Sequence, residues 1–218
     1  MAIEVTSEFK KWLWEKKAER CIQNLKKHRF DAHFAQTAEA AGNLVMKMVE
    51  SYKTFGFGGS ATLNRLSIKQ ALIDKGKTLF DHNDNTLSFE EKQAFRIKQG
   101  TCDCFLLSAN GISETGEIVN VDGVGNRTNA MSFGPGKVII VAGMNKVMPD
   151  LHSAIRRVRD VAAPMRAKDL GMDTPCAETG VCSDCNAPMR ICNITAILHR
   201  KPMLTDISVV LINEELGY

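Results

Sequence analysis

The sequence predicts an α/β protein built on an open, mainly parallel β-sheet with helices on both faces. Short β-rich runs, each bounded by Gly, Pro, Asn or Asp, alternate with segments that carry helix start and stop signals. The chain has 218 residues, of which 44% are hydrophobic, so it can bury a full core. Alternation of this kind favours parallel strands, and ligands then bind beyond the carboxyl ends of those strands.

Two amphipathic helices are expected first, over residues 7–29 and 31–52. Apolar residues recur at steps of three and four, namely Trp14, Ala18, Cys21, Ile22 and Leu25, and then Phe34, Ala38, Ala41, Val45, Met48 and Tyr52. Each helix has one apolar face, which the core or a second subunit must cover. We therefore expect an N-terminal helical extension over 1–52, and an α/β domain over 53–218 that includes a cysteine-rich loop at 174–193. A homo-oligomer is left open.

Strands and helices alternate after residue 52. Strands are predicted at 77–81, 103–108, 117–121, 137–142, 194–199 and 207–212. One helix is expected from a cap at Ser60 to Gly76, and a second begins at the capping box of Ser88 and Glu91. A third begins at Pro149 and carries a core-facing stripe.

Charge and hydropathy limit the class of function. Lys+Arg 28 against Asp+Glu 25 gives a net charge of +3. Most basic residues are spread out, and glutamates and two tryptophans interrupt the one run, over 10–29, which argues against a nucleic-acid groove. No segment approaches the roughly eighteen apolar residues of a membrane span. With no signal peptide recognisable, we expect a soluble cytoplasmic protein.

The first candidate ligand loop joins an extended segment to the helix that Ser60 caps. It contains Gly56, Gly58, Gly59 and Ser60. Glycines permit close backbone approach, and free amides at a helix start favour phosphate or carboxylate. The loop lacks the third glycine of a dinucleotide fingerprint and the Gly-Lys-Ser/Thr end of a nucleotide-binding loop. An ordinary tight turn is the alternative.

Polar residues crowd between apolar strands over residues 108–127. The ligand-binding candidates there are Asn110, Asp122, Gly123, Gly125, Asn126 and Arg127. Arg127 would clamp an anion in bidentate fashion, and Glu114 would act as base or nucleophile. A third loop contributes Asn145 and Lys146, and Lys146 is placed to meet a negative group. Asn, Asp and Gly also suit plain turns, and Asp122 with Gly123 fits a hairpin.

Four clustered cysteines are the strongest chemical signal. Cys176, Cys182, Cys185 and Cys192 have the spacing C-x5-C-x2-C-x6-C. In a reducing compartment such clusters hold metal more often than they form disulfides. An iron-sulfur cluster accepts ligands from irregular loops, whereas structural zinc usually takes two short knuckles, and only one C-x2-C is present. We expect an iron-sulfur cluster, with zinc or no metal as alternatives.

Four motifs in order resemble the lactate-utilisation (LUD) domain family. They are Gly58 to Leu63, Ala109 to Gly116, Asp122 to Arg127, and Val141 to Lys146. The resemblance covers roughly residue 32 to 218. It implies the open α/β fold shared by glucosamine-phosphate deaminases, ribose-phosphate isomerases and CoA transferases. It also implies a link to the oxidation of lactate to pyruvate, beside or fused to iron-sulfur subunits.

The resemblance and the residues together leave three functions open. No flavin or nicotinamide fingerprint is visible, so we expect an accessory or electron-transfer component of lactate utilisation that binds a small anionic metabolite and an iron-sulfur cluster. The second hypothesis is an acyl- or phosphosugar-handling enzyme that uses Glu114. The third is a non-catalytic scaffold with a structural zinc, which pairs with iron-sulfur partner subunits. Substrate identity and catalysis stay open.

Overall fold

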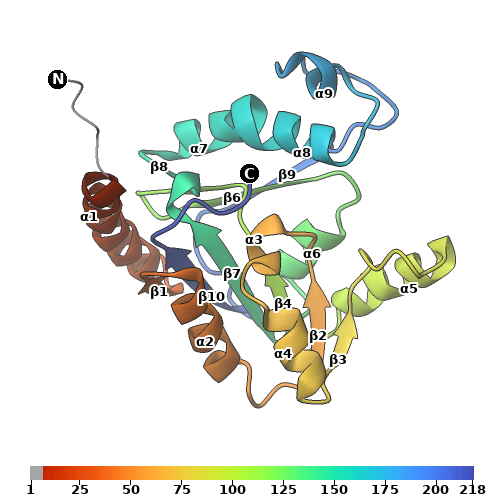
Figure 1. Cartoon of the computed structure of the whole chain (residues 1–218), viewed down its shortest axis with the longest axis horizontal. Coiled ribbons are helices and arrows are strands. Elements are labelled where there is room, and N and C mark those ends of the chain that lie inside the picture. The colour runs from red at the N-terminus through yellow and green to blue at the C-terminus, as the bar shows by residue number, and fades with distance from the viewer. Residues whose placement is uncertain (1–6) are drawn as a thin grey trace.

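The computed structural model describes residues 7–218; residues 1–6 of the predicted extension lie outside the described residues. Its main element is a six-stranded sheet in the order β1-β10-β7-β4-β2-β3, in which every pairing is parallel (Figure 1). The strands are β1 (Asp31–Ala35), β2 (Thr54–Phe57), β3 (Thr78–Phe80), β4 (Cys104–Leu107), β7 (Lys137–Gly143) and β10 (Asp206–Ile212). The predicted open, mainly parallel α/β sheet is confirmed.

The central strand β7 contributes side chains to the hydrophobic core on both faces of this sheet. All seven of its residues are buried. Val138 and Ile140 belong to one core cluster and Ile139 and Val141 to the other, because successive side chains of a strand point to opposite faces. The second cluster packs under α2 (Ala38–Met48), α3 (Ala61–Asn64) and α4 (Ile68–Asp74). The near-continuous apolar run of β7 is what a doubly covered parallel strand requires.

A second, smaller sheet covers part of the other face. It has the order β8-β5-β6-β9, formed by β5 (Gly111–Ser113), β6 (Ile118–Asp122), β8 (Val147–Met148) and β9 (Ile194–Leu198). Its β5-β6 and β6-β9 pairings are antiparallel. The predicted strands at 117–121 and 194–199 therefore do not join the main sheet, which is a correction to the expected single sheet.

One long helical segment lies over the small sheet. It consists of α7 (Leu151–Arg157), a π-helical turn (Val158–Ala162) and α8 (Ala163–Asp169), and it runs above β6 and β9 (Figure 1). Ala154 and Val158 pack against Val119 of β6. The helix starts at Leu151, two residues later than the predicted Pro149, because the carboxylate of Asp150 accepts from Ser153 N at 2.7 Å and caps it. The small sheet is thus held between this segment and the main sheet.

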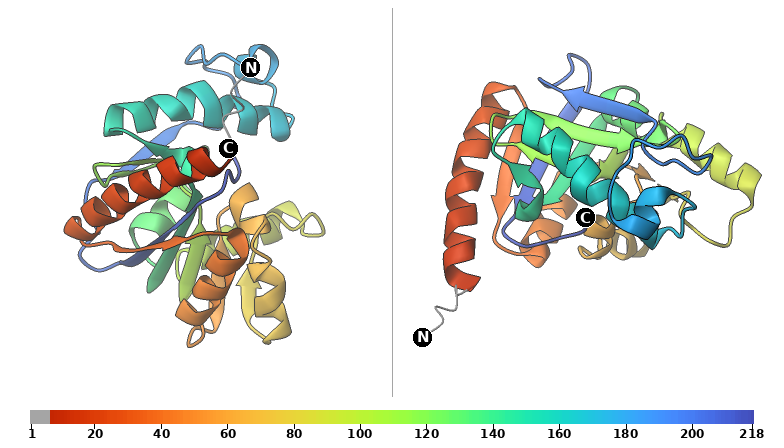
Figure 2. Two further views of the ribbon diagram at one scale, coloured as in Figure 1. Left: turned by 60° about the vertical axis from the view of Figure 1, so that its left-hand side comes forward. Right: turned by 90° about the horizontal axis from the view of Figure 1, so that it is seen from above.

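The predicted helix over 31–52 is wrong at its start. Residues Asp31–Ala35 form β1, which pairs with β10, and α2 follows after the N-cap Thr37. Burial of Ala32 and Ala35 against the sheet outweighs the helical spacing of the apolar residues. Residues 31–52 therefore supply a strand to the main sheet. The first predicted helix is present as α1 (Ser7–Lys27), which lies along one edge of the molecule beside β1 (Figure 2).

Local start signals agree with the structure more closely. Ser60 caps α3, but the predicted helix to Gly76 divides into α3 and α4 at Ser67, which has a φ of 53°. The capping box of Ser88 and Glu91 is present in full at α5 (Phe89–Gln99). The remaining helices are α6 (Asn126–Ser132) and α9 (Pro175–Thr179), with a 3₁₀ turn at Met144–Lys146.

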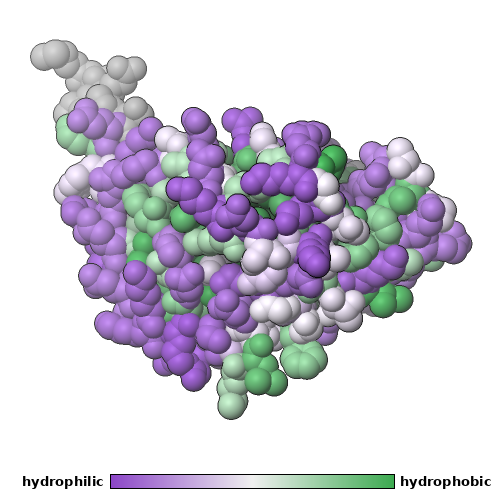
Figure 3. Space-filling model, turned by 90° about the horizontal axis from the view of Figure 1, so that it is seen from below, coloured by the Kyte–Doolittle hydropathy of each residue, from purple (hydrophilic) through white to green (hydrophobic). Residues whose placement is uncertain are grey.

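Surface character gives no sign of a bilayer-spanning element. Within residues 7–218, none of the helices combines the length and apolarity needed to cross a membrane. The face seen from below is mainly hydrophilic, with apolar residues in separate patches (Figure 3).

Candidate functional site

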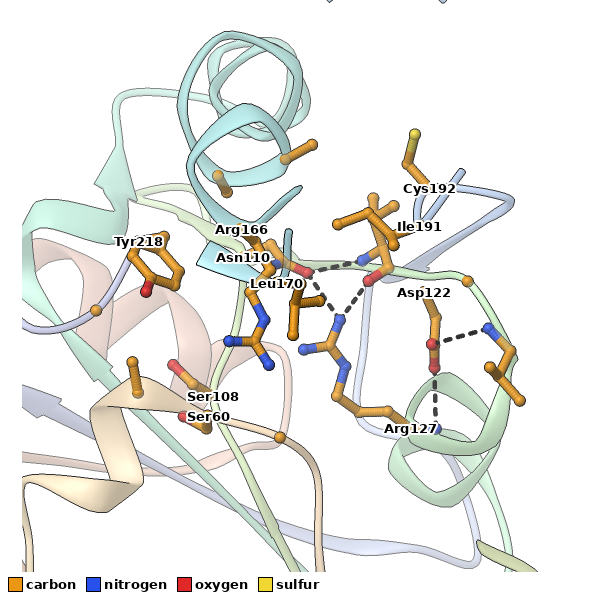
Figure 4. Close-up of a pocket in the computed structure, with 18 of the residues that line it drawn as sticks. Ser60, Ser108, Asn110, Asp122, Arg127, Arg166, Leu170, Ile191, Cys192 and Tyr218 are labelled. Atoms are coloured by element: carbon orange, nitrogen blue, oxygen red, sulfur yellow. Dashed lines mark hydrogen bonds between the residues drawn. The ribbon is translucent and has the colours of Figure 1, made fainter. Parts of the chain in front are cut away.

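A cavity of about 540 Å³ lies at the carboxyl ends of the main-sheet strands, between the two sheets and α8 (Figure 4). Ser60 reaches it from the loop after β2, Ser108 from the loop after β4, and Lys146 from the turn after β7. Arg127 comes from α6 and Arg166 from α8. The position agrees with the expectation that ligands bind where parallel strands end.

Lys146 is a buried amine of this cavity. Its side chain belongs to the 3₁₀ turn that ends β7, and the residue is only 4% exposed. Its Nζ donates to Thr62 Oγ1 and to Ser108 Oγ, each at 3.0 Å. Burial, followed by the charges of Arg157 and Arg127, lowers the pKa of Lys146 to about 7. Near neutral pH this lysine is therefore only partly protonated.

Arg127 is held by acceptors on β6 and its neighbours. Its Nη2 donates to Asn110 Oδ1 at 3.3 Å and to the backbone oxygen of Val121. The carboxylate of Asp122 accepts from the backbone N–H of Arg127 at 2.9 Å and of Thr128 at 3.1 Å, so it caps α6. Burial lowers the pKa of Arg127, Asp122 raises it, and the neighbouring charge of Arg166 lowers it again.

The cavity carries an excess of positive charge. Among its described lining residues the basic side chains are Lys92, Arg96, Arg127, Lys146 and Arg166, whereas Asp122 is the one acidic side chain. The guanidinium groups of Arg127 and Arg166 reach into the same space (Figure 4). Arg166 is partly neutralised by its ion pair with Asp169. Two like charges held this close favour an anion between them.

The structure brings together most of the predicted ligand-binding residues. Gly59, Ser60, Asn110, Asp122, Gly123, Asn126, Arg127 and Lys146 line the cavity, and Gly56, Gly58, Gly125 and Asn145 do not. Those four residues shape the cavity without lining it. Gly56 packs beneath Phe105, Gly125 starts α6 with a φ of 100°, and Asn145 bonds to the backbone of Leu216 and Gly217.

Glu114 lies outside the cavity. Its carboxylate pairs with Arg20 of α1 at 2.8 Å, and its backbone oxygen accepts from Asn24 at 2.7 Å. The predicted role as base or nucleophile thus has no support in its position, because β5 carries the residue away from the strand ends and towards α1. Glu114 joins α1 to the small sheet.

Several lining residues have no clear signal in the sequence. They are His82, Lys92, Arg96, Arg166 and Tyr218. Lys92 and Arg96 stand four apart on α5, a spacing that indicates a shared helix face. Burial and the charge of Arg96 lower the pKa of His82, so His82 adds little charge. Arg166 lies on the polar side of its helix, and the sequence of that helix indicates only the apolar stripe.

The cysteine quartet borders this cavity through Cys192. Burial raises the pKa of the Cys192 thiol, Arg190 lowers it, and the nearby Cys182 and Cys185 raise it further. All four thiols are free and half-buried. However, no group of three or more His, Cys, Asp or Glu side chains in residues 7–218 is arranged to hold a metal ion. The predicted metal centre at the quartet therefore stays a prediction.

The fold and this cavity define a class: an α/β protein with a cationic pocket at the strand ends of a parallel sheet. A family model for the LUD domain matches residues 18–212. The chain therefore belongs to the LUD domain family, as the four motifs predict. No curated protein matches it.

Two solved structures are similar to the chain. A DUF162 family protein from Deinococcus radiodurans is 11% identical, with a TM-score of 0.55 over 91% of this chain and 98% of that chain. Ribose 5-phosphate isomerase from Plasmodium falciparum is 17% identical, with a TM-score of 0.31 over 50% and 52%. The first likeness shows a shared fold alone, and the second is too partial to bear on the site.

Proposed function

We propose that this LUD domain protein binds a small anionic metabolite in the cavity between its two sheets. The convergence of Arg127, Arg166 and Lys146 supports this proposal, since the one lining carboxylate, Asp122, is already bonded to backbone N–H groups. A carboxylate or phosphate would replace water between the two guanidinium groups and accept from both. The volume of about 540 Å³ suits a metabolite of a few carbons with bound water.

Family membership supports a narrower proposal for the ligand. We infer that the anion is a metabolite of lactate utilisation or of the utilisation of a related 2-hydroxy acid. The chain would then be an accessory or electron-transfer component of that process. All seven cysteines are free, which suits a reducing compartment, so the cytoplasm is the proposed location. Titration with lactate, pyruvate and inorganic phosphate separates this ligand class from a phosphosugar one.

Calorimetric titration with oxalate and with inorganic phosphate tests the anion site itself. Arg166→Gln should weaken binding about ten- to a hundred-fold, since a hydrogen bond to a charged group is worth about 1.5–3 kcal/mol. Arg156→Gln is the matched control, because Arg156, like Arg166, pairs with an aspartate within one helical turn, yet lies outside this cavity. Equal weakening in both variants, or no binding by the natural protein, contradicts the proposal.

A metal centre at the cysteine quartet is a separate proposal, supported by the spacing of Cys176, Cys182, Cys185 and Cys192 in one irregular loop. Because no three of these thiols are grouped to hold a metal ion in the described part of the chain, coordination would require residues 176–192 to rearrange. Protein purified without oxygen should then carry iron and absorb near about 400 nm. Roughly one zinc per chain would favour the structural alternative. Protein that is purified without metal and takes up none during anaerobic reconstitution would contradict both the iron-sulfur and the zinc proposal.

A further inference from the structure

Lys146 is equipped for more than charge attraction. Two buried lysines flank β7: Lys137 begins the strand and Lys146 follows its end. Lys137 is paired with Asp206 at 2.7 Å. Lys146 forms no salt bridge with any described residue, and hydroxyl groups are its acceptors. An amine buried without a carboxylate readily loses its proton, and a neutral lysine amine is a nucleophile.

The surroundings of this amine fix its direction. Asn145 accepts from Leu216 N at 3.1 Å and donates to Gly217 O at 3.2 Å, so the segment 216–218 is held against the 3₁₀ turn. A Cβ on Gly217 would lie 3.3 Å from Lys146 Nζ, which shows how closely that backbone packs. With Thr62, Ser108 and Gly217 around it, the amine faces the cavity that it lines.

The two hydroxyl groups differ in what they can still donate. Thr62 Oγ1 donates its proton to the backbone oxygen of Leu216 at 3.0 Å. Ser108 Oγ has two possible acceptors for its proton, Ala109 O and Thr62 Oγ1, and both contacts are long, at 3.4 Å. Ser108 is therefore the hydroxyl that can give a proton to an atom in the cavity.

We propose that Lys146 forms an imine with a small carbonyl compound that carries a carboxylate or phosphate, and this rests on the anion site proposed above. The neutral amine of Lys146 attacks the carbonyl carbon, and the carbonyl oxygen takes a proton from Ser108. The Ser108 oxygen recovers a proton from the nitrogen, whose other hydrogen leaves with the oxygen in the next step. The resulting carbinolamine loses that oxygen as water, and a carbon–nitrogen double bond replaces the carbon–oxygen one. No electrons are gained or lost. Arg127 and Arg166 hold the anionic group.

Borohydride trapping tests the imine. The full chain is incubated with pyruvate, or in a parallel arm with dihydroxyacetone phosphate, and then reduced. A single adduct per chain is expected, heavier by the mass of the carbonyl compound less one oxygen atom. Peptide mapping should place it on Lys146. The arm that gives the adduct identifies the anionic group as carboxylate or phosphate.

Two lysine variants test whether the adduct forms on Lys146. Lys146→Arg keeps N–H donors at this position but no longer forms an imine, so the adduct should disappear, whereas Lys137→Arg should keep it. Titration with oxalate, which forms no imine, reports the anion site separately. Oxalate binding without an adduct in either arm, or adducts confined to other lysines, overturns the imine while the anion site stands. Absence of oxalate binding by the natural protein overturns both the imine and the anion site.

Discussion

Gly58 and Arg127 are in mutual contact at the edge of the cavity: a Cβ on Gly58 would lie 2.9 Å from Cδ of Arg127 and 3.0 Å from its Cγ. The backbone N–H of Gly58 donates to the oxygen of Leu106 at 2.9 Å, which ties the loop to β4. Gly58 thus contributes to the site through the space that it leaves for the arginine, although it does not line the cavity.

Gly58→Ala should therefore displace Arg127. The added methyl group also meets Leu107 Cβ at 3.2 Å, and overpacking of this kind costs about 1–3 kcal/mol. Oxalate binding should weaken by about ten-fold or more as the guanidinium group moves. Calorimetry measures this, with Gly136→Ala as control because its Cβ would meet Asp103 O at an ordinary 3.4 Å. Unchanged binding would show that Arg127 is not a ligand.

Lys146 should give the protein a distinctive stability profile in mild alkali. Its pKa is lowered by burial to about 7 in the folded state, against 10.5 for an unperturbed lysine. Between these values the unfolded chain binds the extra proton, so stability should rise with pH by on the order of 1 kcal/mol per unit. Below about pH 7 the penalty of burying the charge is fully present.

Urea denaturation from pH 7 to pH 10 of the natural protein and of Lys146→Met measures this contribution. The difference in the free energy of unfolding between the two proteins should shift in favour of the natural one as pH rises. A difference that stays constant across the range would mean that Lys146 titrates normally.

Asp122→Ala should destabilise the protein through α6. The carboxylate accepts from the N–H groups of Arg127 and Thr128, and the N-cap residue, Gly125, offers no side chain. Leaving these donors unpaired costs about 1–3 kcal/mol. Asp122→Asn is the milder control, since the amide keeps one acceptor oxygen. Chemical denaturation at neutral pH measures the two losses, and equal stability of all three proteins would contradict the assigned cap.

Acid should remove part of the same contribution. Burial raises the pKa of Asp122, but the charge of Arg127 and the backbone N–H groups outweigh it, so the net shift is downward from 3.8. The stabilisation is therefore present above about pH 4 and is lost as pH falls through the lowered pKa. The advantage of the natural protein over Asp122→Asn should shrink in that acidic range.

Glu114→Gln should leave anion binding unchanged. Neither Glu114 nor its partner Arg20 lines the cavity, and the arginine side chain is 55% exposed, so solvent screens the pair. Such pairs contribute about 0–1 kcal/mol. Oxalate titration and thermal unfolding check both points. A large loss of binding would restore Glu114 as a site residue.

Six of the strands and several helix starts are determined locally, and the sequence predicts them. Ser88 and Glu91 lie three residues apart, so their capping box is readable without knowledge of the rest of the chain. The glycine-rich loop and Lys146 are readable for a similar reason: each follows directly on an apolar strand. Together with the four motifs, these features predict the fold, the family and eight of the residues that line the cavity.

Only the tertiary structure decides which strands pair. Asp31 meets Ser208 across β1 and β10, and an alternating apolar pattern is the same whichever sheet a strand joins. Pairing into a second sheet places α8 over the strand ends, and this brings Arg166 opposite Arg127 while Glu114 is carried to α1. Charge and burial at the site come from contacts between residues far apart in the chain, so no local pattern reports them.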